Sequence, residues 1–194
     1  MGLGYRTRDR NRPENLMNES VGHSSFLCHC CGNVHHEIPF SFAADFPDPY
    51  ANLSRDDRDN RALISSDQCI IDQELFFLRG CLELPIIGSE DVFLWGVWAR
   101  VHEKDFDTIH QFWEKVGRER LIGPFSGRLM NSLSIYPETF NLRLRIEIQP
   151  AGQRPLFLLE EPEHVLTLEQ QHGLTRDKAN EYACILLRKS QTEI

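Results

Sequence analysis

A strict alternation of apolar and charged residues between Phe140 and Ile148 constrains the fold more than any other stretch of this chain. Aliphatic side chains occupy every second position and polar ones stand between them: Leu142, Leu144, Ile146 and Ile148 against Arg143, Arg145 and Glu147. Successive side chains of a strand point to opposite faces, so the pattern predicts a strand with one buried face and one face in water. Such strands are typical of antiparallel sheets.

Other segments also have the composition and length of strands. They are bounded by turn residues and rich in β-branched or aromatic side chains, and they cover Cys69–Asp72, Leu75–Pro85, Val92–Val101 and Pro155–Glu160. The stretch that holds Gly123, Pro124 and Gly127 predicts a loop, because glycine and proline interrupt regular structure.

Two helices are expected before the alternating strand. Ser54 is the predicted N-cap of a short helix over about residues 55–63, since Asp57 follows it three residues later. A second helix is predicted over about residues 105–116, where apolar residues recur at i, i+3, i+7 and i+10. These form a core stripe of Phe106, Ile109, Trp113 and Val116.

Two more helices are expected near the C-terminus. Thr167 is predicted to cap a short helix that ends at Gly173, and Thr175 to cap a last helix that runs to about Arg188. Strands therefore come first and in the middle, with helices at intervals and at the end. This order predicts an α+β fold, with a mostly antiparallel sheet and three to four helices packed on it.

The length of 194 residues fits one domain. Residues 1–23 carry four arginines among Gly, Asn, Pro and Ser with little apolar content, so they are predicted to be a disordered tail. Residues 24–190 are expected to form a single globular α+β domain that starts with a Cys-x-x-Cys turn.

Charge and hydropathy narrow the class of partner. The net charge of -8 disfavours nucleic acid, because phosphate binding needs a basic face. No apolar stretch is long enough to span a bilayer and no secretory signal is visible, so a cytoplasmic protein without a membrane partner is expected. In that compartment the six cysteines indicate metal ligands or buried small side chains rather than disulfides.

The run from Phe26 to Pro39 is the part of the chain that looks built for chemistry. Cys28 and Cys31 form a Cys-x-x-Cys-Gly turn that directs two sulfurs at one point, and His35 follows four residues later. Thiolates and imidazole are the ligands that zinc prefers in structural sites. The run therefore predicts a zinc site with three local ligands.

A closed zinc site needs a fourth ligand from a distance. Cys69 and His164 are both candidates for that position. The competing interpretations of the run are a surface turn with incidental cysteines, or a redox pair. A redox pair usually opens a helix after a strand, and Pro39 argues against that setting.

Two tryptophans suggest a place for a partner. Trp95 and Trp98 are three residues apart on one predicted strand, so they face opposite sides of the sheet. At least one is expected in the core, and the other, together with Arg79, is a candidate lining of a binding groove. The polar residues around these strand ends, including Asp67, predict either an ion-pair network or a pocket.

Spaced motifs run through residues 26–187 in a fixed order. They are Cys28-x-x-Cys31-Gly-x-x-His35, Arg61-x-Leu with Cys69-x-Ile-Asp72, Phe77-x-Arg79-Gly80, Phe93-x-Trp95-Gly-Val-Trp98, Leu129-x-Asn131, Tyr136-Pro, Arg154-Pro155 and the segment from His164 to Gly173. In this order they resemble a bacterial family of uncharacterised proteins catalogued as domain of unknown function 2199. The resemblance implies a single compact bacterial domain and no particular activity.

The resemblance also bears on the metal. The family pattern contains Cys69 together with the Cys-x-x-Cys pair, which favours a zinc site of Cys28, Cys31, His35 and Cys69, with His164 as the alternative fourth ligand. Members of the family often read His-Pro-Leu where this chain has His164-Val-Leu.

Two functional hypotheses follow. The first is a zinc-stabilised binding or regulatory module with a protein or small-molecule partner. The second is a metal-dependent enzyme of hydrolase type, in which three protein ligands leave an open zinc position for water and Glu37 or Asp67 acts as general base. The number of protein ligands on the metal distinguishes the two.

Overall fold

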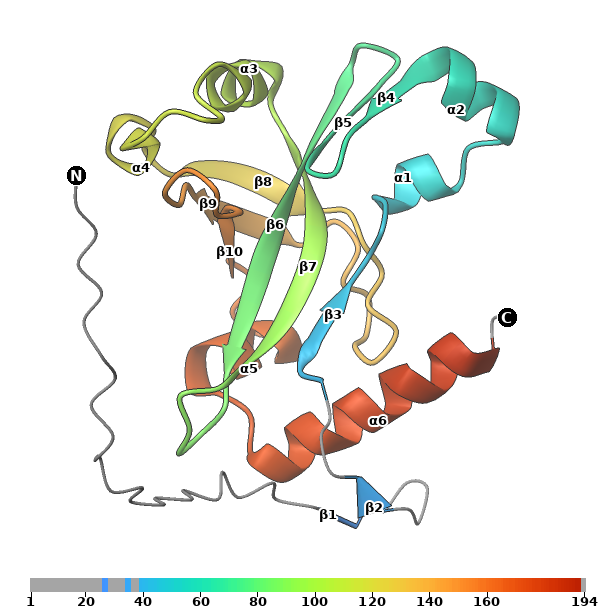
Figure 1. Ribbon diagram of the computed structural model, residues 1–194, viewed down its shortest axis with the longest axis vertical. Helices are drawn as coiled ribbons and strands as arrows, with labels where there is room; N and C mark the ends of the chain where they lie inside the picture. The colour runs from blue at the N-terminus through green and yellow to red at the C-terminus, as the bar shows by residue number, and fades with distance from the viewer. Residues whose placement is uncertain (1–25, 28–33, 36–38, 193–194) are drawn as a thin grey trace, which may run out of the picture.

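The computed structural model describes residues 26–27, 34–35 and 39–192 (Figure 1). The strands of this part are β1 Phe26–Leu27, β2 Val34–His35, β3 Ser41–Ala43, β4 Ala62–Ile64, β5 Gln68–Ile71, β6 Leu75–Pro85, β7 Val92–Val101, β8 Phe125–Leu129, β9 Arg143–Glu147 and β10 Leu156–Leu159. The helices are α1 Asp48–Ala51, α2 Arg55–Arg61, α3 Glu103–Gln111, α4 Arg118–Leu121, α5 Val165–His172 and α6 Arg176–Thr192. The Cys-x-x-Cys turn lies outside the described residues.

Five strands close into a barrel. β6, β7, β8, β9 and β10 pair in chain order, each antiparallel to the next, and β10 then pairs with β6. An up-and-down path with five strands leaves the first and last strands pointing the same way, so this closing pair is parallel. β3 adds to β7 as a second parallel pair, and β5 and β4 extend the sheet beyond β6.

Glycines let the barrel close tightly. A Cβ at Gly80 of β6 would lie 2.3 Å from the ring of Phe157 on β10. A Cβ at Gly127 of β8 would lie 2.6 Å from Ile146 on β9. The missing side chains therefore make room for large side chains of the neighbouring strands, which fill the interior.

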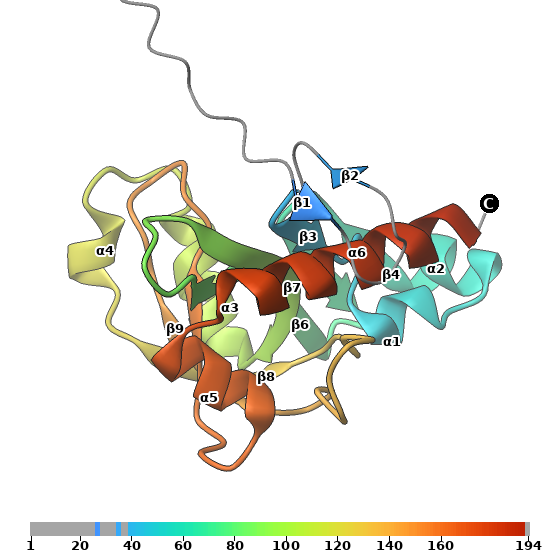
Figure 2. The same cartoon turned by 90° about the horizontal axis from the view of Figure 1, so that it is seen from below.

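Helices cover both ends of the barrel (Figure 1). At one end Phe106 and Ile109 of α3 are buried in the main core, and the ring of Phe106 lies 5.3 Å from that of Phe76. At the other end α5 and α6 bury Leu166, Ala179 and Ala183 in the same core. Figure 2 shows α6 lying across that end. The core is thus the barrel interior together with its two helical lids.

A second, smaller core lies on the outside of the barrel. Trp98 and Phe77 point outward from β7 and β6 and pack with Cys69, Ile71 and Met130. Tyr50 and Leu53, from α1 and the turn after it, pack against them. This cluster attaches β4, β5 and the α1–α2 segment to the barrel.

Several predicted elements are confirmed. β6 and β7 have the expected bounds, the Ser54 hydroxyl accepts the amide of Asp57 at 3.1 Å, and the Thr175 hydroxyl accepts the amide of Lys178 at 3.2 Å. The α+β class is also confirmed. Within the described residues, however, the structure has six helices rather than three to four, and its sheet is mixed and closed rather than a mostly antiparallel layer.

Three local predictions were wrong. The helix predicted to reach residue 116 ends at Gln111, and Val116 is 88% exposed rather than part of the core stripe. The stretch with Gly123, Pro124 and Gly127 was expected to be a loop, but Phe125–Leu129 forms β8, because Gly127 is the small residue that barrel closure requires. The cap of α5 is His164 rather than Thr167, since the ring of His164 accepts the amide of Leu166 at 3.1 Å. Thr167 is buried within the first turn.

Candidate functional site

A polar pocket of about 540 Å³ opens on the outside of the barrel beside β6 and β10. Side chains of both signs line it, together with one aromatic ring: Asp67, Cys81, Glu83, Trp113, Glu114, Arg118, Gln149, Gly152, Gln153, Arg154 and Leu156. We call it the Arg154 pocket. Its volume lies in the range of small-molecule sites.

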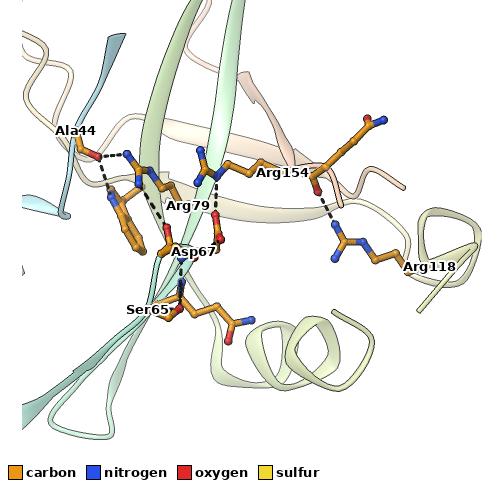
Figure 3. Close-up of polar contacts among 10 residues, drawn as sticks. Ala44, Ser65, Asp67, Arg79, Arg118 and Arg154 are labelled. Carbon is orange, nitrogen blue, oxygen red and sulfur yellow. Dashed lines mark hydrogen bonds and ion pairs between the residues drawn. The ribbon is translucent and has the colours of Figure 1, made fainter. Parts of the chain in front are cut away.

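An ion pair between Arg154 and Asp67 forms one wall of the Arg154 pocket (Figure 3). The Nε of Arg154 donates to Oδ1 of Asp67 at 2.5 Å, and the Ser66 hydroxyl donates to the other carboxylate oxygen at 2.6 Å. The terminal nitrogens of Arg154 have no other partner among the described residues. The hydrogen bond of Nε therefore orients the guanidinium, and its two terminal nitrogens remain available to a ligand.

Burial would raise the pKa of Asp67, but this effect is outweighed. Hydrogen bonds from Ser66 and Arg154, with the charges of Arg154 and Arg79, hold the pKa of Asp67 below its ordinary value. A carboxylate with a lowered pKa and two donors is a poor proton acceptor at neutral pH. Asp67 is therefore better suited to position Arg154 than to act as a general base.

The backbone around β6 fixes both partners of this ion pair. The Ser65 hydroxyl accepts the amides of Asp67 at 3.3 Å and Gln68 at 3.0 Å, which shapes the turn before β5. The carbonyl of Asp67 accepts the amide of Arg79 at 2.9 Å. The residue after Arg154 is Pro155, whose carbonyl accepts the amide of Cys81 at 2.8 Å. The backbone amides of Arg79 and Cys81, on the outer face of β6, therefore hold the two segments that carry the ion pair.

Arg118 builds the opposite wall of the Arg154 pocket. Its side chain is 1% exposed and donates to four backbone carbonyls, those of Trp113, Gln149, Pro150 and Gln153. Its guanidinium also lies over the ring of Trp113, 4.9 Å from the centroid. Burial lowers its pKa, although the nearby charges of two glutamates oppose this. Arg118 thus ties two loops together and shapes the pocket.

The Arg154 pocket holds no activated nucleophile among its described residues. Cys81 is half-buried on its floor, and burial raises the pKa of the thiol despite the nearby charge of Arg154. A thiol with a raised pKa is less ionised than a free cysteine at neutral pH. The arrangement is suited to binding rather than to covalent chemistry.

Only some of the predicted zinc ligands are among the described residues. Cys28 and Cys31 are outside the described residues, and His35 is in β2. Cys69 is in β5, fully buried in the outer apolar cluster, where burial raises the pKa of its thiol to about 12. Figure 1 shows the β1–β2 hairpin and β5 at opposite ends of the molecule. The structure does not bring Cys69 next to His35.

His164 uses both of its ring nitrogens within the fold. Its Nε2 lies 2.7 Å from the carbonyl of Pro137, and its Nδ1 accepts the amide of Leu166. This arrangement leaves no ring nitrogen for a metal. Over the part of the chain that the structure describes, no group of three or more His, Cys, Asp or Glu side chains is arranged to hold a metal ion.

Of the three residues predicted to line a groove, both tryptophans are buried and the arginine lies over one of them. Trp95 is 4% exposed in the main core and Trp98 is 1% exposed in the outer cluster, which confirms that they face opposite sides of β7. The guanidinium of Arg79 lies 5.7 Å from the centre of the Trp98 ring and donates to the carbonyl of Ala44 at 2.9 Å. Arg79 therefore shields the ring of Trp98 from solvent, and the two residues do not form an open groove.

The sequence interpretation named Asp67 as part of a network or pocket, but it missed two other residues of the Arg154 pocket. Arg154 is 87 residues away along the chain from Asp67, and Arg118 bonds only to backbone carbonyls in its described contacts. Neither has a local pattern that marks it. The Arg154-Pro155 pair within the family resemblance was the available signal.

A family model described as an uncharacterised protein conserved in bacteria, DUF2199, matches residues 27–174. The chain belongs to this bacterial family. The segment that matches DUF2199 contains every residue of the Arg154 pocket, whereas α6 lies beyond it. Neither the curated proteins nor the solved structures contain a match to this DUF2199 chain. No helix within the described residues has both the length and the apolar character needed to cross a bilayer.

Proposed function

We propose that the protein is a binding module whose Arg154 pocket takes a small zwitterionic molecule. The observation that carries the proposal is the Arg154 guanidinium, which Asp67 holds through Nε while its terminal nitrogens face no protein partner within the described structure. A guanidinium presented in this way matches the two oxygens of a carboxylate.

The remaining lining of the pocket supports a ligand with a positive group as well. Glu83 and Glu114 are in the lining and carry negative charge, and Gln149 and Gln153 supply amides. A carboxylate on Arg154 and an ammonium group near the glutamates would complement both signs. Free α-amino acids are the simplest molecules with this pair of groups.

Thermal unfolding in the presence of each of the twenty standard L-amino acids tests the proposal. At least one is expected to raise the melting temperature of the wild type, because a ligand at about 100 times its Kd stabilises the folded state by about 2.7 kcal/mol. Arg154→Gln is expected to abolish that rise, since an uncharged amide replaces the guanidinium.

Arg176→Gln is the matched control. Arg176 is also a partly exposed arginine in an ion pair, with Asp91, but it lies outside the Arg154 pocket. This variant should keep the full ligand response. Absence of a response to every amino acid, or an equal response in the Arg154→Gln variant, would contradict the proposal.

We further propose that zinc stabilises the N-terminal part of this module through Cys28, Cys31 and His35. The β1–β2 pairing supports this, because it sets Phe26 opposite His35 and Leu27 opposite Val34. The two ends of the segment between them are thereby held side by side. Cys69 is packed in the outer cluster and His164 is hydrogen-bonded through both ring nitrogens, so the zinc proposal rests on the three local ligands.

Purified protein is expected to contain about one zinc per chain by elemental analysis, and Cys28→Ser to lose the metal and melt at a lower temperature. Cys81→Ser, at a cysteine outside the motif, should retain the zinc. Protein without zinc would contradict the site. An unchanged melting temperature after metal loss would contradict its structural role.

X-ray absorption at the zinc edge separates the two functional hypotheses. Four sulfur or nitrogen ligands at about 2.0–2.3 Å indicate a closed structural site, as a binding module requires. Three such ligands and one oxygen indicate an open position, which is the arrangement of a metal-dependent hydrolase.

A further inference from the structure

A row of arginines crosses the outer face of the barrel. The strand register sets Arg100 of β7 opposite Arg128 of β8, and Arg128 opposite Arg143 of β9. Directly opposite residues on antiparallel strands have Cβ atoms about 4.5–5.5 Å apart. Like charges in such pairs are destabilising, so the row has an electrostatic cost that a bound anion would offset.

Two of these three arginines lack a carboxylate partner. Arg143 is bound by Glu161 through two contacts, at 2.9 and 3.3 Å. Arg128 donates to the carbonyl of Asn141, a neutral acceptor, at 3.2 Å, and its charge acts on Glu161 only at longer range. Within the described residues neither Arg100 nor Arg128 has an ion-pair partner. Arg100 and Arg128 are therefore adjacent guanidiniums that form no direct ion pair within the described part of the chain.

The same two arginines line a separate pocket of about 720 Å³. Its walls come from the start of β6 and the turn before it, the end of β7, the start of α3, the middle of β8 and the turn before β9. The lining residues are Gln73, Glu74, Phe76, Arg100, Val101, His102, Glu103, Ser126, Gly127, Arg128 and Asn141. We call it the Arg100–Arg128 pocket. It shares no residue with the Arg154 pocket.

A helix start adds to the positive potential. α3 begins at Glu103 on the wall of the Arg100–Arg128 pocket, and the side chain of its N-cap residue, His102, makes no capping hydrogen bond. The first amides of a helix carry a partial positive charge that favours an anion. The first turn of α3 also carries Glu103 and Asp105, which offset this partial charge, so the two arginines supply the main attraction for an anion.

The backbone at the edge of this pocket is unusual. Gln73 has φ of 58° and Asn141 has φ of 69°, both in the left-handed region that residues other than glycine seldom adopt. The amide of Asn141 is held by the carbonyl of Leu129 at 2.7 Å, and its own carbonyl orients Arg128. Gln73 is in the turn between β5 and β6, where positive φ is common, and asparagine adopts this region more readily than most residues, so both angles belong to turns that shape the pocket edge.

We propose that the Arg100–Arg128 pocket binds the phosphate group of a small metabolite, gripped between the two guanidiniums. Arginine forks pair with phosphate through two parallel hydrogen bonds, and two of them match its double charge. Glu74 and Glu103 also line the pocket and repel an anion placed against them. The phosphate therefore sits on the β7–β8 side.

Thermal unfolding with inorganic phosphate and with pyrophosphate, each against sodium chloride of equal ionic strength, tests this site. Both anions are expected to raise the melting temperature of the wild type above the chloride reference. Arg128→Gln and Arg100→Gln are each expected to lose that rise. Each variant without ligand should be as stable as the wild type or more so, because the repulsion between the arginines is removed.

Arg176→Gln serves as the control for charge alone, since it removes one ion-paired arginine from another part of the molecule. Its phosphate response should equal that of the wild type. Loss of the response in this control would show a general ionic effect and overturn the proposal. So would a response to a single-stranded oligonucleotide with none to phosphate or pyrophosphate, because the partner would then be a nucleic acid.

Discussion

Replacing Arg118 by methionine is expected to lower the free energy of unfolding by about 3 kcal/mol. Methionine keeps the length of the side chain but offers no donor, so the carbonyls of Trp113, Gln149 and Gln153 lose the hydrogen bonds that Arg118 donates to them. Each buried acceptor left without a donor costs about 1–3 kcal/mol, and water entering from the pocket recovers part of that. Urea denaturation of both proteins gives the difference.

The structure supplies a close control for this change. Arg120 lies two residues further along α4, with a side chain 87% exposed and a contact of 3.6 Å to Glu119. Arg120→Met is expected to change the free energy of unfolding by no more than about 0.5 kcal/mol. Equal losses in the two variants would show that the carbonyl contacts of Arg118 do not hold the loops together.

Replacing Glu169 by leucine is expected to lower the free energy of unfolding by about 3 kcal/mol, because a buried carboxylate is lost. Glu169 is 7% exposed and accepts the hydroxyls of Tyr136 at 2.7 Å and Tyr182 at 3.0 Å, while Lys178 pairs with it. Burial and the hydrogen bond to Glu169 raise the pKa of Tyr136, which keeps this hydroxyl a donor. Leucine would leave both hydroxyls and the ammonium group without their acceptor.

Equilibrium unfolding again measures the loss, with Glu181→Leu as the control because Glu181 is exposed on α6. A double-mutant cycle tests the cause. Tyr136→Phe should cost less in the Glu169→Leu background than in the wild type, because the hydroxyl has already lost its partner. Additive losses would mean that the hydrogen bond contributes nothing to stability, and that leucine acts through its shape alone.

The segments that the sequence predicted best are those whose side-chain pattern repeats over many residues. The bounds of β6 and β7 were correct, and β9 lies within the alternating stretch that begins at Phe140. In β9 the period of two is visible without any knowledge of the neighbours, whereas β6 and β7 were recognised by their length and their β-branched and aromatic composition. β8 was missed because Gly127 reads as a turn residue, whereas its role is to admit Ile146.

The candidate sites were predictable only where neighbours in space are also neighbours in sequence. Asp67 could be named because polar residues cluster at the ends of β5 and β6. Its partner Arg154 is distant in the chain, and the opposition of Arg100 to Arg128 depends on the register of β7 against β8. Register and long-range pairing are set by which side chains fill the barrel, and no local pattern records that choice.

The zinc hypothesis likewise combines a local sequence pattern with a long-range contact. The spacing of Cys28, Cys31 and His35 is a local feature, and the sequence alone states it as a prediction. The proposed fourth ligand, Cys69, depends on distance in space, and the fold packs this thiol in the outer apolar cluster. A thiol is small and apolar enough to pack as a core residue, so its chemical type does not distinguish a ligand from a buried side chain.

The amino-acid sequence by itself therefore determined the α+β class, the long strands, the helix caps at Ser54 and Thr175, and membership of the bacterial family. Only the tertiary structure decided that five strands close on themselves, that Trp95 and Trp98 are both buried, and that Arg154 and Arg118 border one pocket. The reason is physical. Alternation and capping are properties of a few adjacent residues, whereas closure and pockets depend on volumes and charges that meet across the whole chain.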